Sequence, residues 1–374
     1  MKRLSNLYPV VCDTETIRMA IRKASLGKRK HKYVRNIVEH EDFYTEEIQK
    51  MLLNKSYVPS EFTPGIIYDG MRRKRREIAK PKFYPDQIVH WCIYLAIKQK
   101  FFKSFYEYSC GSIEGRGVHK GKKYIDKVIY GDKRNTKYYL KLDIHHFYQS
   151  VRVDILMEKL RKRIKDDDFL KLVQVALSQS ETLLIGMLLS QIFANFFLND
   201  FDHWLKQEKG VKHYVRYMDD MVIFGSNKRE LHKLRREIQE ELQKIGLELK
   251  PNWQVCRLDK EPLDFMGFRF FRNKTTIRKL IMLRISRRVS RAAKRKQPTR
   301  ADAFAIVSYM GWIKCTDTNG FYEKWIKPKV DFNQLKNVIR SYSNYENVQE
   351  RKRQQTISMG QDILRGCGLP QLQY

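Results

Sequence analysis

The most informative stretch of this chain for its fold is Tyr214-Val215-Arg216-Tyr217-Met218-Asp219-Asp220-Met221-Val222-Ile223-Phe224. Two adjacent carboxylates interrupt two apolar runs, which predicts a pair of buried β-strands joined by a tight turn. Carboxylates are almost never buried unless they are paired or bind a cation, and strands joined by a turn are rigid enough to aim them at a metal ion. Asp-Asp is also an ordinary turn dipeptide. The stretch therefore predicts a metal site only if other segments supply further ligands.

The composition predicts a globular protein with a polyanionic partner. The 374 residues are 42% hydrophobic, enough for a sizeable core and more than one lobe. Lysine and arginine number 74 against 42 acidic residues, a formal net charge of +32, which favours nucleic acid as the partner. No apolar run of about 18 residues and no signal-peptide pattern occur, so we expect a cytoplasmic protein without a membrane segment. The six cysteines form no Cys-x-x-Cys pair, so we expect reduced thiols.

A third carboxylate falls on another predicted strand. The segment 138–144 alternates strictly between two sets of side chains. One set is expected to face the core and the other to lie on the polar face: Leu140, Leu142 and Ile144 in the first, Tyr139, Lys141 and Asp143 in the second. The sequence therefore predicts Asp143 on the polar face of a half-buried strand.

Helical patterns surround these strands. Apolar spacing predicts an amphipathic helix over 228–245 that ends near Gly246, and the run Ile88–Leu95 is long enough to favour a helix over a strand. From Thr275 to Arg300 the chain carries ten basic residues and no acidic one. The apolar positions of this segment predict one buried stripe under a basic face: Ile281, Ile285, Val289 and Ala292. Together these patterns favour an α+β fold, an antiparallel sheet backed by helices on one face.

The three carboxylates are the set that nucleotide addition requires. Two magnesium ions about 3.5–4 Å apart serve this chemistry, and carboxylate oxygens are the ligands that magnesium prefers. We expect Asp143 and Asp219 to bridge the ions and Asp220 to lie at the periphery, with manganese able to substitute. The predicted catalytic residues are Asp143, Asp219 and Asp220, and the predicted metal ligands are these three and Ile144.

The order of further motifs gives the chain a family resemblance. Lys141–Tyr148, Leu184–Gln191 with Ala194-Asn195, Tyr108–His119, Gly246–Lys250 and Phe265–Phe268 follow one another as in bacterial reverse transcriptases. The chain most resembles those of diversity-generating retroelements, in which Ile-Gly-x-x-x-Ser-Gln replaces the more common Gln-Gly form. The resemblance covers about residues 65 to 270 and implies a right-hand polymerase fold.

The resemblance also implies roles for particular side chains. Tyr148 is expected to lie under the incoming sugar, where its ring would clash with a 2′-hydroxyl, so the implied product is DNA. Ile185 lies beside the templating base in the resembled family and offers shape without a hydrogen bond, which makes low fidelity opposite adenine a hypothesis. The residues expected to bind the nucleotide are Arg76, Lys80, Tyr148, Ile185, Gly186, Gln191 and Lys250. The residues expected to bind primer or template are Tyr217, Met218, Met266, Gly267, Arg284, Arg287, Arg288 and Arg291.

The expected organisation has four parts: an N-terminal extension over 1–65, fingers over 66–130, palm over 131–272, and a helical thumb with a C-terminal tail over 275–374. The implied partners are an RNA template, a DNA or RNA primer, deoxynucleoside triphosphates and a small basic helical accessory protein that forms a ring. The resemblance implies a bacterial or phage-encoded protein. Two alternatives stay open: a related reverse transcriptase of a phage-defence, retron or intron system, and a non-catalytic RNA-binding protein on a polymerase scaffold.

Overall fold

The computed structural model describes residues 3–69, 74–295 and 297–341. The chain divides into two compact units, one made of residues 1–266 and 270–273, the other of residues 267–269 and those from 274 onward. The names fingers, palm and thumb stay predictions. The predicted C-terminal tail lies outside the described residues from position 342 on.

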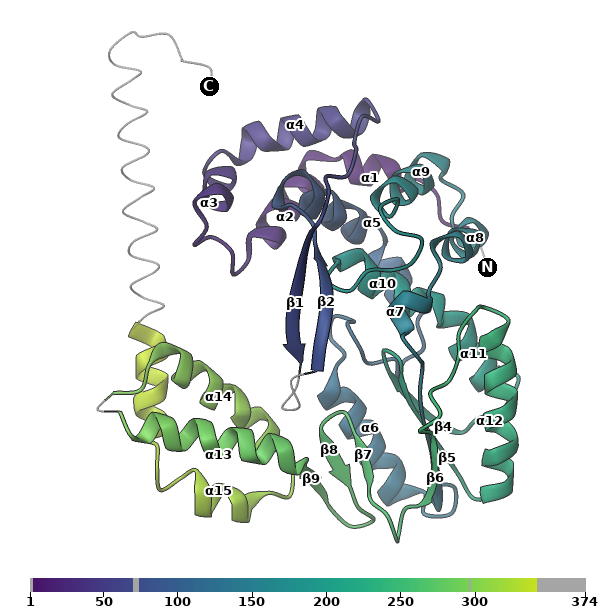
Figure 1. The fold of residues 1–374 in the computed structure, drawn as a ribbon, viewed down its shortest axis with the longest axis vertical. Coiled ribbons are helices and arrows are strands. Elements are labelled where there is room, and N and C mark those ends of the chain that lie inside the picture. Colours follow the sequence, from purple (N-terminus) through teal and green to yellow (C-terminus); the bar gives the residue numbers. More distant parts are fainter. Residues whose placement is uncertain (1–2, 70–73, 296, 342–374) are drawn as a thin grey trace. The chain divides into compact units, whose positions relative to one another are not determined.

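The first unit opens with four helices that pack on one another, and two of them contact a longer helix. These helices are α1 (Tyr8–Cys12), α2 (Thr14–Ser25), α3 (Lys32–Glu39) and α4 (Glu41–Leu53). Asp13 caps α2 by accepting a hydrogen bond from the Thr16 amide. Both α1 and α2 contact α5 (Ile88–Ser104) (Figure 1). Helix α5 confirms the helix expected over Ile88–Leu95, and it extends further than this apolar run.

An antiparallel hairpin precedes α5. Strand β1 (Thr63–Asp69) pairs with β2 (Lys74–Lys80), and a π-helical turn η1 (Phe83–Gln87) leads into α5. The Ala79 amide at the end of β2 donates a hydrogen bond of 2.8 Å to the Ile185 carbonyl. This bond joins the hairpin to a loop that lies far away in the sequence.

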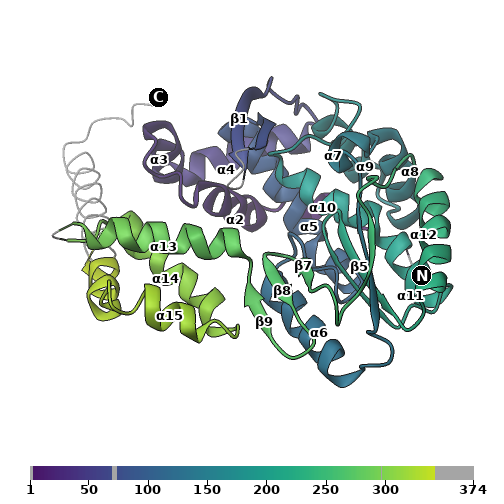
Figure 2. The same ribbon diagram turned by 60° about the horizontal axis from the view of Figure 1, so that its bottom comes forward.

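A four-stranded antiparallel sheet forms the centre of the first unit. Its order is β4-β5-β3-β6, so the hairpin formed by β4 and β5 lies beside β3, the strand that carries Asp143. The strands are β3 (Tyr138–Asp143), β4 (His213–Tyr217), β5 (Asp220–Gly225) and β6 (Gln254–Arg257). Helix α12 (Lys228–Gln243) packs against β3, β5 and β6, and α6 (Val118–Gly131) packs against β4 (Figure 2). The expected hairpin, sheet and amphipathic helix are confirmed, and the left-handed Gly246 follows α12.

The expected alternation of β3 is wrong at Tyr139. This side chain is only 1% exposed, as buried as Leu140 and Leu142. The segment around Asp264 covers the face expected to be polar: Lys141 donates a 2.8 Å hydrogen bond to the Asp264 carbonyl, and Tyr139 lies near Cys256 and Glu261. Lys141 and Asp143 are half-buried, as expected.

The remaining elements of the first unit complete its core. They are α7 (Phe147–Ser150), α8 (Val153–Arg163), α9 (Asp167–Ala176), α10 (Leu188–Phe197), α11 (Asn199–Gln207) and β7 (Leu263–Phe265). Helix α10 is apolar on nearly every side and lies buried in the main hydrophobic cluster. It contacts α5, α8 and α11, so it ties the N-terminal helices to the rest of the unit.

The second unit has its own core. It contains the first two residues of β8 (Phe268–Phe270), β9 (Thr275–Ile277), α13 (Lys279–Ala293), α14 (Arg300–Lys314) and α15 (Asn319–Trp325). Ile285, Val289 and Ala292 are buried, as the predicted stripe requires, whereas Ile281 is partly buried. None of the described helices is long and apolar enough to cross a bilayer. Five cysteines are free thiols, and Cys367 lies outside the described residues.

Candidate active site

The two adjacent carboxylates lie in and beside a two-residue turn. Tyr217 pairs with Asp220 across the hairpin, so Met218 and Asp219 form the turn. Asp220 also stands opposite Asp143 in the pairing of β5 with β3. The Ile144 amide donates a 3.4 Å hydrogen bond to the Asp219 carbonyl. The structure therefore brings Asp143, Asp219 and Asp220 together at one end of the sheet.

The carboxylates repel one another in this position. Burial, followed by the negative charge of Asp143, raises the pKa of Asp219. The same two causes raise the pKa of Asp220 to about 6. One oxygen of Asp143, Oδ2, pairs with the Lys250 ammonium group, but the other, Oδ1, is buried without a hydrogen-bond partner. The cluster thus gathers negative charge that the protein itself only partly compensates.

This donor set fits a divalent cation in its chemistry. In the side-chain positions of the described residues, however, no three His, Cys, Asp or Glu side chains already stand close enough together to hold a metal ion. Lys250 occupies one oxygen of Asp143, while the unpartnered Oδ1 and the raised pKa values mark a site that a cation would stabilise. Hard carboxylate oxygens suit magnesium. The Ile144 side chain is fully buried in the core, so as a ligand this residue could offer only its backbone carbonyl.

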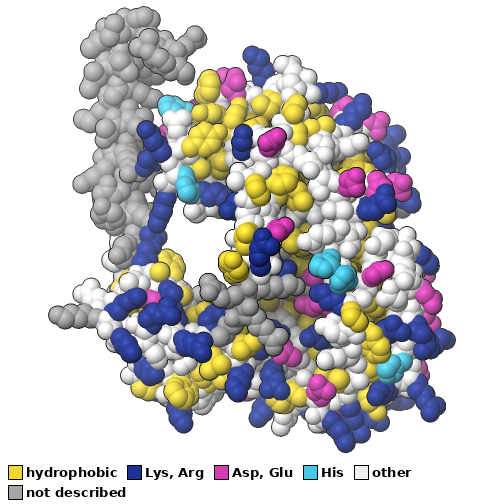
Figure 3. Space-filling model, in the orientation of Figure 1, with side chains coloured by type: hydrophobic (Ala, Val, Ile, Leu, Met, Phe, Trp, Pro, Cys, Tyr) yellow, Lys and Arg dark blue, Asp and Glu magenta, His cyan; other side chains and the backbone are white. Residues whose placement is uncertain are grey.

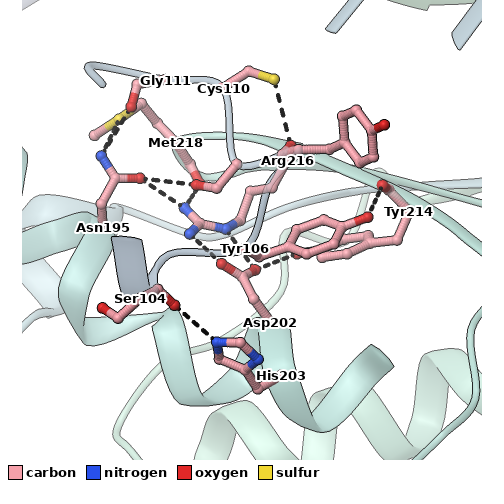
Figure 4. Close-up of polar contacts among 12 residues, drawn as sticks. Ser104, Tyr106, Cys110, Gly111, Asn195, Asp202, His203, Tyr214, Arg216 and Met218 are labelled. Atoms are coloured by element: carbon pink, nitrogen blue, oxygen red, sulfur yellow. Dashed lines mark hydrogen bonds and ion pairs between the residues drawn. The ribbon is translucent and has the colours of Figure 1, made fainter. Parts of the chain in front are cut away.

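A buried polar network holds the turn from behind. The Arg216 guanidinium donates to both carboxylate oxygens of Asp202, at 2.8 and 2.5 Å, and these two side chains are essentially unexposed. It also donates to the Met218 carbonyl at 2.9 Å and to Asn195 Oδ1 at 3.1 Å (Figure 4). Arg216 thus ties the turn that carries Asp219 to helices α10 and α11.

Gly111 lies against this turn. Its carbonyl accepts a hydrogen bond of 2.9 Å from the side-chain Nδ2 of Asn195, and a Cβ at this position would come within 2.7 Å of the Met218 backbone nitrogen. Met218 adopts a left-handed backbone with φ of 56°, which is uncommon outside glycine. Only a residue without a side chain lets the two backbones approach this closely.

Tyr148 lies beside the carboxylates. Burial, followed by the charge of Asp219, raises its pKa to about 12, while the nearby Arg76 guanidinium opposes this shift. The structure therefore brings Tyr148, Arg76 and Asp219 into one neighbourhood. Lys250 joins it through its ion pair with Asp143 and through its backbone amide, which donates to the Asp143 carbonyl at 2.8 Å.

The loop before α10 carries the expected Ile185-Gly186 pair. Gly186 has φ of +108°, and a Cβ there would lie 2.4 Å from the Ala79 carbonyl oxygen. Glycine is therefore required for the loop to dock on β2. Lys80, Gly186 and Gln191 line the same cavity of about 450 Å³, which places three of the residues expected to bind the nucleotide side by side.

The residues expected to bind primer and template fall in different places. In the first unit, Met218 is buried in the turn, Tyr217 is half-buried, and Met266 packs against Gly121 of α6. In the second unit, Gly267 lies close to Ile281 and Trp312. Their contact with nucleic acid stays a prediction.

The arginines of α13 differ from one another. Arg284, Arg287 and Arg291 are exposed, and Figure 3 shows Lys and Arg side chains gathered over the helices of the second unit. Arg288 instead forms a 2.7 Å ion pair with Asp302, a side chain of α14 that is only 2% exposed. Arg288 therefore has a role in packing α13 on α14 that the sequence did not predict.

Several residues around the site were missed in the sequence analysis. Arg216 and Asp202 were not singled out, because a buried ion pair between a strand and a helix leaves no periodic signal. His90 and Lys28, which line the cavity together with Lys80, were not singled out, because a cavity formed by segments distant in the chain leaves no local pattern. A basic residue in an otherwise apolar strand was the one available clue for Arg216.

Comparisons with known proteins agree with this geometry. Residues 86–270 match the family model described as reverse transcriptase (RNA-dependent DNA polymerase), which supports the predicted α+β right-hand polymerase fold. No curated protein matches the chain by sequence.

Solved structures similar to the chain include two telomerases. One is apo telomerase from Candida tropicalis, with 14% identity over 57% of this chain and 48% of that chain and a TM-score of 0.42. The other is telomerase from Candida albicans in complex with a TWJ fragment of telomeric RNA, with 12% identity over 84% of this chain and 64% of that chain and a TM-score of 0.46. The chain thus spans about half to two thirds of the length of these structures.

Proposed function

From the reverse transcriptase domain that the chain carries at residues 86–270, we propose that the protein is an RNA-directed DNA polymerase that adds deoxynucleotides at the Asp143, Asp219 and Asp220 cluster. The observation that carries this proposal is the convergence of three carboxylates, one at the end of β3 and two in and beside the β4–β5 turn, on one end of the sheet, with the buried Asp143 Oδ1 left unpartnered. RNA template, primer and deoxynucleoside triphosphates are the proposed partners.

The side chains around the cluster have separate tasks in this proposal. The three carboxylates hold divalent cations, magnesium or manganese, which when bound would activate the primer 3′-hydroxyl and neutralise the leaving pyrophosphate. Arg76 binds the triphosphate, because a guanidinium is suited to bidentate phosphate contact. Lys250 holds Asp143 in place through its ion pair. Arg216 keeps the Met218-Asp219 turn in position.

The product is DNA in this proposal because of Tyr148. The ring is half-buried and lies near Asp219 and Arg76, so it is held beside the place where the incoming sugar would sit. A ring fixed there leaves no room for a 2′-hydroxyl, the group that distinguishes a ribonucleotide.

Primer extension tests the proposal directly. The full chain is supplied with an RNA template, an annealed DNA primer, the four deoxynucleotides and magnesium. We expect a DNA strand complementary to the template, and omission of magnesium should stop its synthesis. Binding of the primer–template without any extension, with either magnesium or manganese, would favour the non-catalytic RNA-binding alternative and overturn the proposal.

The finer proposal is an error-prone enzyme of a diversity-generating retroelement. It is supported by Ile185-Gly186 in the loop that docks on β2, since an aliphatic side chain offers a template base no hydrogen bond. A phage-defence, retron or intron enzyme is the alternative. We expect misincorporation opposite template adenine to fall in the Ile185→Asn variant, measured by sequencing the cDNA. Equal, low error rates in both proteins would remove this finer proposal.

A further inference from the structure

A cavity in the first unit has a lining that the proposed polymerase reaction explains only in part, because Lys28, His90 and Trp91 have no role in that reaction. Its volume is about 450 Å³, within the range of small-molecule sites. It lies where the end of β2, the start of α5 and the loop before α10 meet. The lining side chains that matter here are Lys28, Lys80, Gln87, His90, Trp91 and Gln191.

His90 is the unusual member of this lining. Its side chain is 2% exposed, and its Nε2 atom has no hydrogen-bond partner. A buried polar atom without a partner destabilises the fold, and a hydrogen bond from a ligand atom in the cavity would offset this cost. Burial also lowers the pKa of His90 to about 4, so the ring is neutral at physiological pH and can bond to an uncharged ligand group.

Two lysines give the cavity a positive side. The Lys28 ammonium group bonds to Gln87 Oε1, and Gln87 is itself held by a 2.7 Å hydrogen bond to the Pro81 carbonyl. Lys28 is therefore kept at the cavity wall, and Lys80, whose ammonium group lies against Gly65 of β1, also lines the cavity. No acidic side chain is among the described residues that line the cavity, so an anionic group would be attracted without competition.

Trp91 adds a flat apolar surface. The indole is half-buried and makes an edge contact with Tyr94, with ring centroids 5.2 Å apart and planes at 77°. This contact restrains the plane of the indole. A planar base against Trp91, a polar base atom near His90 and a phosphate near the lysines together describe one nucleotide.

We propose that this cavity receives one unpaired nucleotide of the template strand, ahead of the base being copied. The inference rests on the proposed function, because the cavity shares Lys80, Gly186 and Gln191 with the expected nucleotide site. A free nucleoside triphosphate has the same chemistry and is the other possible source. The cavity then fixes the path of the single-stranded template before it reaches the carboxylates.

Binding measurements on the full chain test this proposal. A labelled primer–template duplex with a template overhang of none to about six nucleotides is titrated without deoxynucleotides or metal. We expect the affinity of the wild type to rise by about tenfold at one overhang length, as stacking of a base on an aromatic side chain predicts. An abasic residue at that template position should remove the rise.

Variants tie the effect to the cavity. Trp91→Leu and Lys28→Gln should each lose most of the rise, and His90→Phe should lose part of it. Trp204→Leu, an indole on α11 that does not line the cavity, is the matched control and should retain it. A rise that survives in both Trp91→Leu and Lys28→Gln, or no rise at any overhang length, would overturn the proposal.

Two further arms separate the outcomes. If dATP alone binds in a Trp91-dependent manner while the overhang has no effect, the cavity is a site for free nucleotides and the proposal is wrong. Primer extension is measured on the same preparations. Extension without an overhang effect removes the cavity proposal and leaves the polymerase proposal standing. An overhang effect without extension overturns the polymerase proposal, and with it the role of the cavity in copying, and leaves only a site that binds an unpaired nucleotide.

Discussion

At the scale of single residues, Asp219 is both destabilising in the folded protein and proposed as a metal ligand. Its carboxylate is half-buried beside Asp143 and Asp220, and repulsion raises its pKa. An uncharged amide of the same size relieves this repulsion but is a poor ligand for magnesium. We therefore expect Asp219→Asn to retain or raise the melting temperature and to reduce primer extension by at least about a hundredfold.

The matched control for this variant is Asp167→Asn, an exposed aspartate in the first turn of α9. It should leave extension unchanged. Thermal unfolding and extension are measured on the same samples. Extension by Asp219→Asn at the wild-type rate would show that the assigned carboxylate does not serve the reaction.

His90 makes the stability of the protein dependent on pH. Its folded pKa of about 4 lies below the ordinary value of 6.5, so the unfolded chain takes up a proton first as the pH falls. The free energy of unfolding is therefore highest above about pH 6.5, where His90 is neutral in both states, and it falls progressively toward about pH 4. Between about pH 7.5 and 5 we expect a loss of about 2 kcal/mol in the free energy of unfolding.

Urea unfolding at the two pH values checks this expectation against the His90→Gln variant. The variant lacks the titrating ring, so its free energy of unfolding should fall by about 2 kcal/mol less than that of the wild type over the same pH interval. The other eight histidines are common to both proteins and cancel in the comparison. An identical pH dependence in both proteins would contradict the assignment.

At the scale of elements, the Arg216 network joins the carboxylate hairpin to α10 and α11. Arg216→Met leaves the Asp202 carboxylate buried and unpaired, which typically costs about 3–5 kcal/mol. The double variant Arg216→Met with Asp202→Leu removes both charges, so we expect it to recover much of the stability. Its extension activity should stay low, because the Met218 carbonyl has lost its anchor.

The comparison of the two readouts separates positioning from stability. Unfolding free energies and the kcat and KM of extension are measured for the wild type, both single variants and the double variant. We expect kcat to fall while the KM for the nucleotide changes little. Full activity in a restored double variant would show that Arg216 serves only the stability of the fold.

At the scale of the whole molecule, the charge of +32 governs the affinity for nucleic acid. Release of counterions from phosphates makes the logarithm of the binding constant fall linearly with the logarithm of salt concentration. We expect the affinity for a primer–template duplex to fall by about two orders of magnitude or more between low and moderate salt. A flat salt response would exclude a basic nucleic-acid surface.

The exposed arginines of α13 should contribute to this slope. Replacing Arg284, Arg287 and Arg291 by glutamine removes up to three phosphate contacts, so the magnitude of the slope should decrease by about 2 to 3. Fluorescence anisotropy over a salt series measures both slopes. A matched set of exposed lysines in the first unit should change the slope less when replaced by glutamine: Lys100, Lys103 and Lys171.

Sequence reasoning predicted the elements of the site better than their environment. The hairpin around Asp219, the strand that ends at Asp143 and the helix after Phe224 follow from local apolar periodicity, which is a short-range property. Tyr139 was misplaced because the segment around Asp264, which is distant in the sequence, covers the face that alternation assigned to solvent. The ion pair of Arg288 with Asp302 was not predicted, because Asp302 lies on another helix, whereas the contact of Arg288 with nucleic acid stays a prediction.

The amino-acid sequence was enough to predict three carboxylates on strands and a turn, and a motif order similar to that of reverse transcriptases. Both predictions depend only on residue type and on periodicity along neighbouring positions. Three features could be seen only in the folded chain: Asp143 lies opposite Asp220, Arg216 anchors the turn through Asp202, and His90 lines a cavity with its Nε2 atom left without a hydrogen-bond partner. These facts depend on contacts between segments distant in the chain. Such contacts are selected by packing and charge compensation over the whole core, which no local pattern encodes.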